Sequence, residues 1–96
     1  MEKFKGTPGP WVAHDDEESM ATSVIISDSL DIIAVVGTYM TSTEEDYANA
    51  SLIAAAPELL EALQKMVSKA YKQNWNDAYP EEIQSAQAAI NKALGE

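Results

Sequence analysis

The first part of the chain alternates turn-forming segments with short runs of β-branched and apolar residues. Such runs occupy residues 10–14, 22–27 and 31–38, and their composition predicts three strands of an antiparallel sheet. The Asp28–Asp31 segment between the last two runs favours a hairpin turn. Neither of these two runs alternates cleanly between polar and apolar positions. Apolar side chains are therefore expected on both faces of the sheet, the second face being covered by another element or another subunit.

A helical repeat of apolar residues fills the middle of the chain, from residue 43 to residue 72. Ser42 and Glu45 have the spacing of a capping box at its start. Pro57 lies inside this repeat, where it removes a backbone hydrogen bond at a typical cost of about 3 kcal/mol, so a kink is expected there. The repeat is expected to turn one apolar stripe inward, made of Leu52, Ile53, Ala56, Leu59, Leu60, Leu63, Met66, Val67, Ala70 and Tyr71.

A second helix is predicted over residues 80–94. Pro80 suits a first helical position, and Glu81 and Glu82 suit the positive end of the helix dipole. A polar, aromatic connection precedes it. Together the patterns predict one α+β domain over residues 1–96. Its small antiparallel sheet of about three strands is expected to pack against the kinked helix 43–72 and the helix 80–94. The second of these helices is expected to turn four apolar positions inward: Ile83, Ala86 or Gln87, Ile90 and Leu94.

The composition narrows the chemistry that the chain can carry. It has no cysteine and one histidine, His14, which excludes disulfides, thiolate nucleophiles and multi-histidine metal clusters. We expect no metal site and no cofactor. No stretch approaches the roughly 20 apolar residues that cross a bilayer, and the first residues lack the apolar segment of a signal peptide. A cytosolic protein without a membrane contact is the expectation.

The charge balance argues against direct contact with nucleic acid. Sixteen acidic residues stand against six lysines, and the formal net charge is −10. Such a field repels phosphates unless cations are strongly clustered. The chain also lacks arginine, the usual bidentate reader of phosphate and guanine. A protein partner or a small ligand is therefore favoured over DNA or RNA.

Several residues are candidates for ligand or partner contacts. Trp11 and Trp75 are large enough to stack on a ligand. For Trp11 we favour a core position against the small side chains of residues 54–56, although a second subunit's helix could occupy that alanine surface instead. Trp75 and the neighbouring Tyr79 suit recognition as well as capping. Lys65, Lys69 and Lys72 share one helix face; intrahelical ion pairs explain most of this, and an anionic ligand is the alternative.

Catalysis has little support in the sequence. His14 with Asp15 and Asp16 resembles a general base beside an orienting carboxylate, but neighbouring residues of these types arise easily in an acidic loop. The same acids lack the spaced oxygen ligands and the glycine of a calcium loop. A non-enzymatic protein is the expectation.

Two segments resemble a pattern found in small accessory proteins of tailed phages and prophages, including early-region proteins of lambdoid phages. The first is Thr7-Pro8-Gly9-Pro10-Trp11, and the second runs from Asn49 to Leu63 with the core Leu-Ile-Ala-Ala-Ala-Pro-Glu-Leu-Leu. The matching positions cover about a fifth of the chain. The resemblance implies a phage origin and no particular activity. Asn49 falls on a motif position, where its amide gains little from helix propensity, so it joins the candidate contact residues.

These observations leave three functional hypotheses. The first is a non-catalytic accessory protein that inhibits or modulates a host factor, plausibly in counter-defence, by occupying a protein or by sequestering a small nucleotide signal. A sponge of the latter kind would use the lysine triplet and Trp75 in a pocket between subunits. The second is an acidic DNA mimic that blocks a DNA-binding protein. The third is a small enzyme using His14. A homodimer or higher homo-oligomer stays open.

Overall fold

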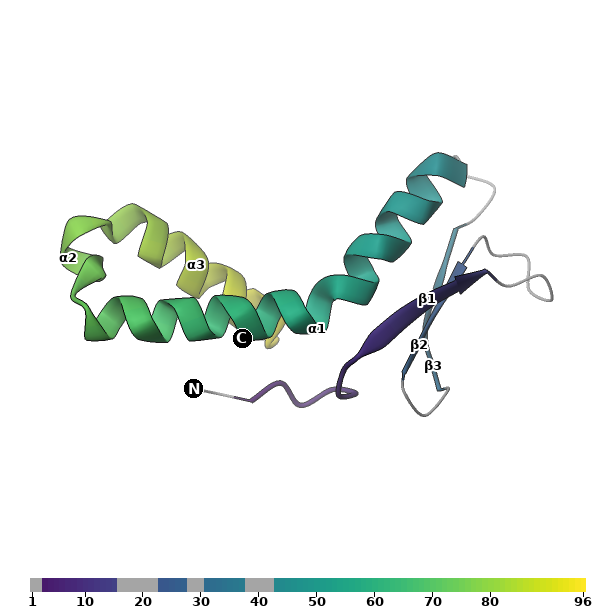
Figure 1. Ribbon diagram of the computed structural model, residues 1–96, viewed down its shortest axis with the longest axis horizontal. Helices are drawn as coiled ribbons and strands as arrows, with labels where there is room; N and C mark the ends of the chain where they lie inside the picture. The colour runs from purple at the N-terminus through teal and green to yellow at the C-terminus, as the bar shows by residue number, and fades with distance from the viewer. Residues whose placement is uncertain (1–2, 16–22, 28–30, 38–42) are drawn as a thin grey trace. The chain divides into compact units, whose positions relative to one another are not determined.

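The computed structural model describes residues 3–15, 23–27, 31–37 and 43–96. Within these ranges the chain forms a three-stranded antiparallel sheet followed by helices, so the predicted α+β fold is confirmed (Figure 1). Each strand has five residues: the first has the predicted length but is shifted by one position, whereas six residues were predicted for the second strand and eight for the third. A short helix after residue 74 was not predicted. The elements are β1 (Trp11–Asp15), β2 (Ser23–Ser27), β3 (Ile32–Val36), α1 (Thr43–Lys72), α2 (Trp75–Ala78) and α3 (Pro80–Ala93).

The chain divides into two compact units that share α1. The sheet unit is Gly6–Glu58, and the helical unit is Leu59–Glu96 with the described part of the first five residues. The division follows directly after Pro57, the position at which the helix loses a backbone hydrogen bond. The single domain expected over residues 1–96 stays a prediction.

Antiparallel pairing in the order β1-β2-β3 builds the sheet. The predicted hairpin of β2 and β3 is present, and its turn is held at the ends, where the Ser27 amide donates to the Asp31 carbonyl at 2.9 Å. Ile25 pairs with Ala34, whereas Ile26 pairs with Ile32. Ile33 is therefore an extra residue in β3, which makes a β-bulge. The bulge agrees with the burial of β3, in which the neighbours Ile33 and Ala34 both pack against the core.

One face of the sheet packs on the first half of α1. Ile25, Val36 and Ala50 are 0%, 6% and 1% exposed and form the centre of this core. Small residues of the helix allow the backbone to approach the sheet. The core is completed by the partly buried side chains of Trp11, Ala13, Ile33, Ala34, Ile53 and Ala54.

The opposite face of the sheet is apolar and exposed. Val12, Ile32 and Val35 keep 46%, 65% and 60% of their surface in solvent. The register places Val12 beside Ile26, and Ile26 beside Ile32. The expectation that apolar side chains occupy both faces is thus confirmed, while the cover expected over the second face stays a prediction.

The opening segment packs against the middle of α1. The Trp11 indole nitrogen donates a hydrogen bond to the Thr7 carbonyl at 3.1 Å, and the ring lies half-buried against the core that also includes Ala54. A Cβ on Gly9 would lie 2.8 Å from Cβ of Pro57. The predicted core position of Trp11 is confirmed. The two sequence motifs therefore meet in space at Gly9 and Pro57. Only a glycine at position 9 allows so close an approach.

In the helical unit, the second half of α1 runs to Lys72 and α3 begins at Pro80, as predicted. Asn74 reverses the chain between them with φ 59°, a left-handed conformation that asparagine tolerates better than most residues. Gly95, with φ 83°, follows the end of α3. Among the described helices, none is long and apolar enough to cross a membrane.

The single inward stripe expected for α1 is wrong at four positions. Leu52, Leu59, Met66 and Tyr71 are 63%, 54%, 63% and 47% exposed. The apolar positions of α1 form a band that is wider than one packing face. The sheet and α3 cover only part of it, and the remainder stays in solvent. Ser42, the expected cap of α1, lies outside the described residues.

We expect Ile25→Ala to lower the free energy of unfolding by about 2–5 kcal/mol, because it leaves a cavity in the centre of the sheet core. The matched control is Ile32→Ala, which removes the same atoms from a side chain that is 65% exposed in the same sheet. Its cost should stay below about 1 kcal/mol. Denaturant unfolding followed by circular dichroism measures both values, and equal losses would contradict the assigned faces.

Gly9→Ala should destabilise the protein by about 1–3 kcal/mol, because the new methyl group would overlap the Pro57 ring on a helix that cannot easily move. Gly9→Ser should cost more, since its hydroxyl needs further space at the same point. Thermal unfolding of the two variants tests this order. A melting temperature at or above that of the parent protein would show that Gly9 and Pro57 are not in close contact.

Candidate partner-binding groove

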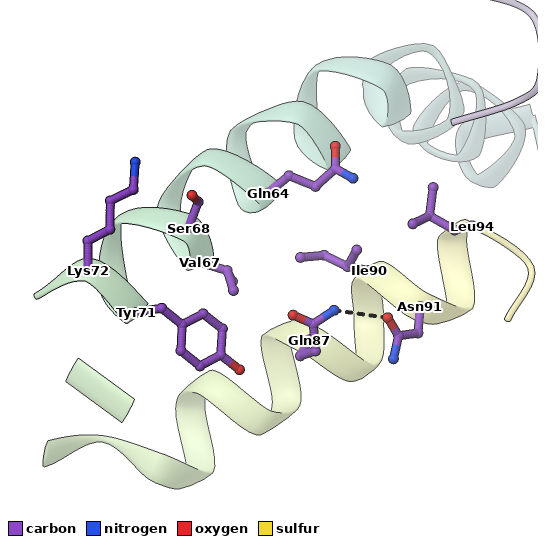
Figure 2. Close-up of a pocket in the computed structure, with 9 residues that line it drawn as sticks. All are labelled: Gln64, Val67, Ser68, Tyr71, Lys72, Gln87, Ile90, Asn91 and Leu94. Atoms are coloured by element: carbon purple, nitrogen blue, oxygen red, sulfur yellow. Dashed lines mark hydrogen bonds between the residues drawn. The ribbon is translucent and has the colours of Figure 1, made fainter. Parts of the chain in front are cut away.

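The helical unit has one buried seam with a hollow on each side. Within its described residues, the buried apolar side chains are Val67 and Ala70 of α1 and Ile90 of α3. Figure 2 shows Val67 and Ile90 pointing toward one another between the two helices. Two helices can bury only the narrow strip along which they touch, so other apolar positions of both helices remain accessible.

The first hollow is polar and has a volume of about 380 Å³. Along α3, the Gln87 side-chain amide nitrogen donates a hydrogen bond to the side-chain oxygen Oδ1 of Asn91 at 2.9 Å (Figure 2). The Tyr71 ring leans toward α3, whereas the Lys72 side chain points away from it. Amide and hydroxyl groups can hydrogen-bond a small polar ligand. The Lys72 ammonium group points outward, however, and would bind a phosphate in this hollow only weakly. The lining is Gln64, Val67, Ser68, Tyr71, Lys72, Gln87, Ile90, Asn91 and Leu94.

The second hollow, which we call the aromatic groove, is apolar and measures about 300 Å³. Met66, Trp75 and Tyr79 line it and are 63%, 42% and 56% exposed. Glu82 is the one charged residue among its lining side chains. Such a surface can bury apolar groups of a partner and offers one carboxylate for a cation. The complete lining is Leu63, Met66, Val67, Ala70, Trp75, Tyr79, Glu82, Ile83 and Ala86.

The structure brings Trp75 and Tyr79 together but separates them from the lysines. Lys65 forms an ion pair with Glu61 at 3.0 Å, with both side chains about two-thirds exposed. This is the intrahelical pairing that the spacing predicted. Lys72 lines the polar hollow, and Lys69 is exposed outside the lining of either hollow. The lysine triplet and Trp75 therefore do not share the lining of either of these two hollows.

The remaining candidates lie in the sheet unit. Trp11 belongs to its core, and Asn49 is exposed on α1. His14 is exposed on β1, opposite Val24, and the acids at positions 16–18 lie outside the described residues. Within the described ranges, no group of three or more His, Asp or Glu side chains is arranged to hold a metal ion.

The sequence did not identify the rest of the aromatic groove. Leu63, Met66, Ile83 and Ala86 all belonged to stripes that were expected to face inward. A usable signal was present, because α1 carries more apolar positions than one packing face can cover. Which of these positions stay accessible depends on where α3 docks, and that contact is tertiary.

The comparison with known protein families agrees with the phage origin that the motifs implied. The family model described as Salmonella phage P22 protein Y8K6 matches residues 1–96. The chain belongs to this phage protein family. No curated protein and no solved structure matches it significantly.

We expect the aromatic groove to tolerate truncation better than the seam beside it. Ile90→Ala should lower the free energy of unfolding by about 2–4 kcal/mol, because Ile90 is 5% exposed between α1 and α3. Met66→Ala removes a side chain of similar size that is 63% exposed and should cost less than about 1 kcal/mol. Denaturant titration of both variants measures the difference. A larger loss for Met66→Ala would place that side chain in a packed core instead.

Proposed function

We propose that this phage protein is a non-catalytic accessory protein of the host cytosol that inhibits or modulates a host factor by occupying a host protein. The observation that carries the proposal is the aromatic groove, where Met66, Trp75 and Tyr79 expose large apolar surfaces side by side along one lining. Trp and Tyr are the residues most enriched at the energetic centres of protein interfaces. Exposed apolar patches of this kind mark interaction sites.

A nucleotide sponge receives less support than a protein target. It needs cations and a stacking ring around one ligand, and the helical unit holds Lys72 and Trp75 in different hollows. The acidic DNA mimic is supported by the net charge of −10. This hypothesis does not explain the apolar groove, because apolar side chains do not imitate phosphates. An enzyme using His14 draws no support from the two hollows, because this exposed side chain of β1 lines neither of them.

We also propose that the protein acts early in infection. The phage family and the resemblance to early-region proteins favour expression early in infection and a role in counter-defence. A small protein with a strongly acidic surface can remain dispersed at high concentration in a crowded cell, which suits stoichiometric inhibition of a host protein. No catalytic turnover is then needed, because occupancy alone blocks the target.

Affinity capture from infected host cells should recover a host protein that depends on the aromatic groove. We expect Trp75→Ser with Tyr79→Ser to reduce its recovery by more than about 30-fold, which corresponds to the loss of roughly 2 kcal/mol or more at an interface centre. The control is Leu52→Ser, an exposed apolar residue of the sheet unit. Quantitative mass analysis of protein and small-molecule fractions gives the readout, with phage plating efficiency as the functional measurement.

Other outcomes of this experiment would refute the proposal. Recovery that collapses by more than about 100-fold on raising the salt concentration, with no effect of the two substitutions, would favour the DNA mimic. A nucleotide enriched in the small-molecule fraction, in place of any protein, would favour the sponge. Turnover of a substrate that His14→Ala abolishes would favour an enzyme.

A further inference from the structure

We infer that the aromatic groove binds an amphipathic helix of a partner protein, and that this helix carries basic side chains beside its apolar stripe. The inference rests on the proposed function, since it names the kind of partner that the groove fits.

The walls of the groove match the apolar stripe of a helix. Leu63, Met66 and Ala70 line one side from α1, at spacings of three and four residues, with Ala70 itself only 1% exposed and Met66 63% exposed. Seven residues of helix span about 10 Å, which is the length over which a docked helix presents its i, i+3 or i+4, and i+7 side chains. Ile83 and Ala86 line the other side from α3. In helix-in-groove recognition an amphipathic helix lays its apolar face into a hydrophobic groove of this kind.

The groove leaves much of its aromatic lining exposed, which suits side chains of a protein partner better than an enclosed small molecule. Small-molecule sites generally bury 70–90% of their ligand, in clefts of about 300–1,000 Å³. The aromatic groove lies at the lower end of this range with about 300 Å³, and Met66, Trp75 and Tyr79 stay roughly half exposed around it. Side chains projecting from a helix can fill such a groove while the helix itself covers the opening.

Charge decides the character of the partner helix. Glu82 is the charged lining residue, and Asp77 and Glu81 lie near Trp75 and Tyr79 in the sequence of α2 and α3. Aromatic faces attract cations through their negative quadrupole, and a guanidinium can stack on the ring while it pairs with a carboxylate. An arginine or lysine beside the apolar stripe of the partner helix would therefore contact both an aromatic ring and a carboxylate at this end of the groove.

A second copy of this chain fits the groove less well. Each copy has a net charge of −10, and pairing would bring two such charges together with two copies of Glu82 in one interface. Like charges placed against one another in a buried interface are unfavourable. A basic partner instead gains from the same field, which also accelerates its association.

Fluorescence anisotropy with labelled synthetic helices tests the inference on the full chain. The first peptide, of about 18 residues, carries leucines at three- and four-residue spacing flanked by arginines. A second replaces the arginines by glutamates, and a third replaces the leucines by serines. We expect the arginine peptide to bind at least about tenfold more tightly than either of the others, because one lost charge contact or one lost apolar anchor costs a factor of this order.

Variants locate the binding site. Met66→Glu should weaken binding of the arginine peptide by at least about tenfold, whereas the matched control Leu52→Glu should change it less than about twofold. Both side chains are 63% exposed on α1 and acquire the same charge, but only Met66 lines the groove. Tyr79→Ser supplies a second groove variant in case Met66→Glu does not fold. Glu82→Gln should reduce the preference for arginine over glutamate by about threefold or more.

Equal binding of the arginine and glutamate peptides, or equal effects of Met66→Glu and Leu52→Glu, would overturn the inference. So would a dimer seen by light scattering that Met66→Glu dissociates, because the groove would then belong to a second copy. The outcomes are separable from those of the proposed function. A host protein captured through the groove but indifferent to basic helices would leave the proposed function intact and remove this inference.

Discussion

The structure depends on one helix serving as the packing surface for two different elements. The first half of α1 supplies Ala50, Ile53 and Ala54 to the core of the sheet unit, and its second half supplies Val67 and Ala70 to the seam with α3. A sheet and a helix require different contact surfaces. The first half of α1 is rich in alanine, which lets the helix backbone approach the sheet, and the second half carries more of the larger apolar residues, such as Leu60, Leu63 and Val67. The composition of α1 changes accordingly on passing Pro57.

This arrangement gives a structural reason for the two motifs that resemble those of phage accessory proteins. Gly9 approaches Pro57 so closely that a Cβ would overlap the proline ring, and Trp11 packs on the core to which Ala54 also contributes. The indole keeps its polar nitrogen satisfied through the Thr7 carbonyl. These motif residues therefore hold the opening segment on the sheet unit.

The proposed binding activity follows from incomplete burial in the helical unit. Two helices and a short connection leave Met66, Trp75 and Tyr79 substantially exposed, although all three are residues that gain from leaving water. In a small chain with limited means of covering its own apolar surface, such residues are explained most simply by a partner. The acidic surroundings restrict that partner to one that tolerates or exploits negative charge.

The sequence by itself determined the elements, because hydrophobic period, turn residues and helix-start signals are local. It placed α1 at residues 43–72, began α3 at Pro80 and identified the hairpin of β2 and β3. It also identified Trp75 and Tyr79 as contact candidates, since their aromatic side chains stand in a polar connection. Only the tertiary structure decided which apolar positions are buried. Met66 and Val67 are neighbours with similar hydrophobicity, yet one is 63% and the other 6% exposed, because burial depends on which face of α1 meets α3, and no local pattern contains that contact.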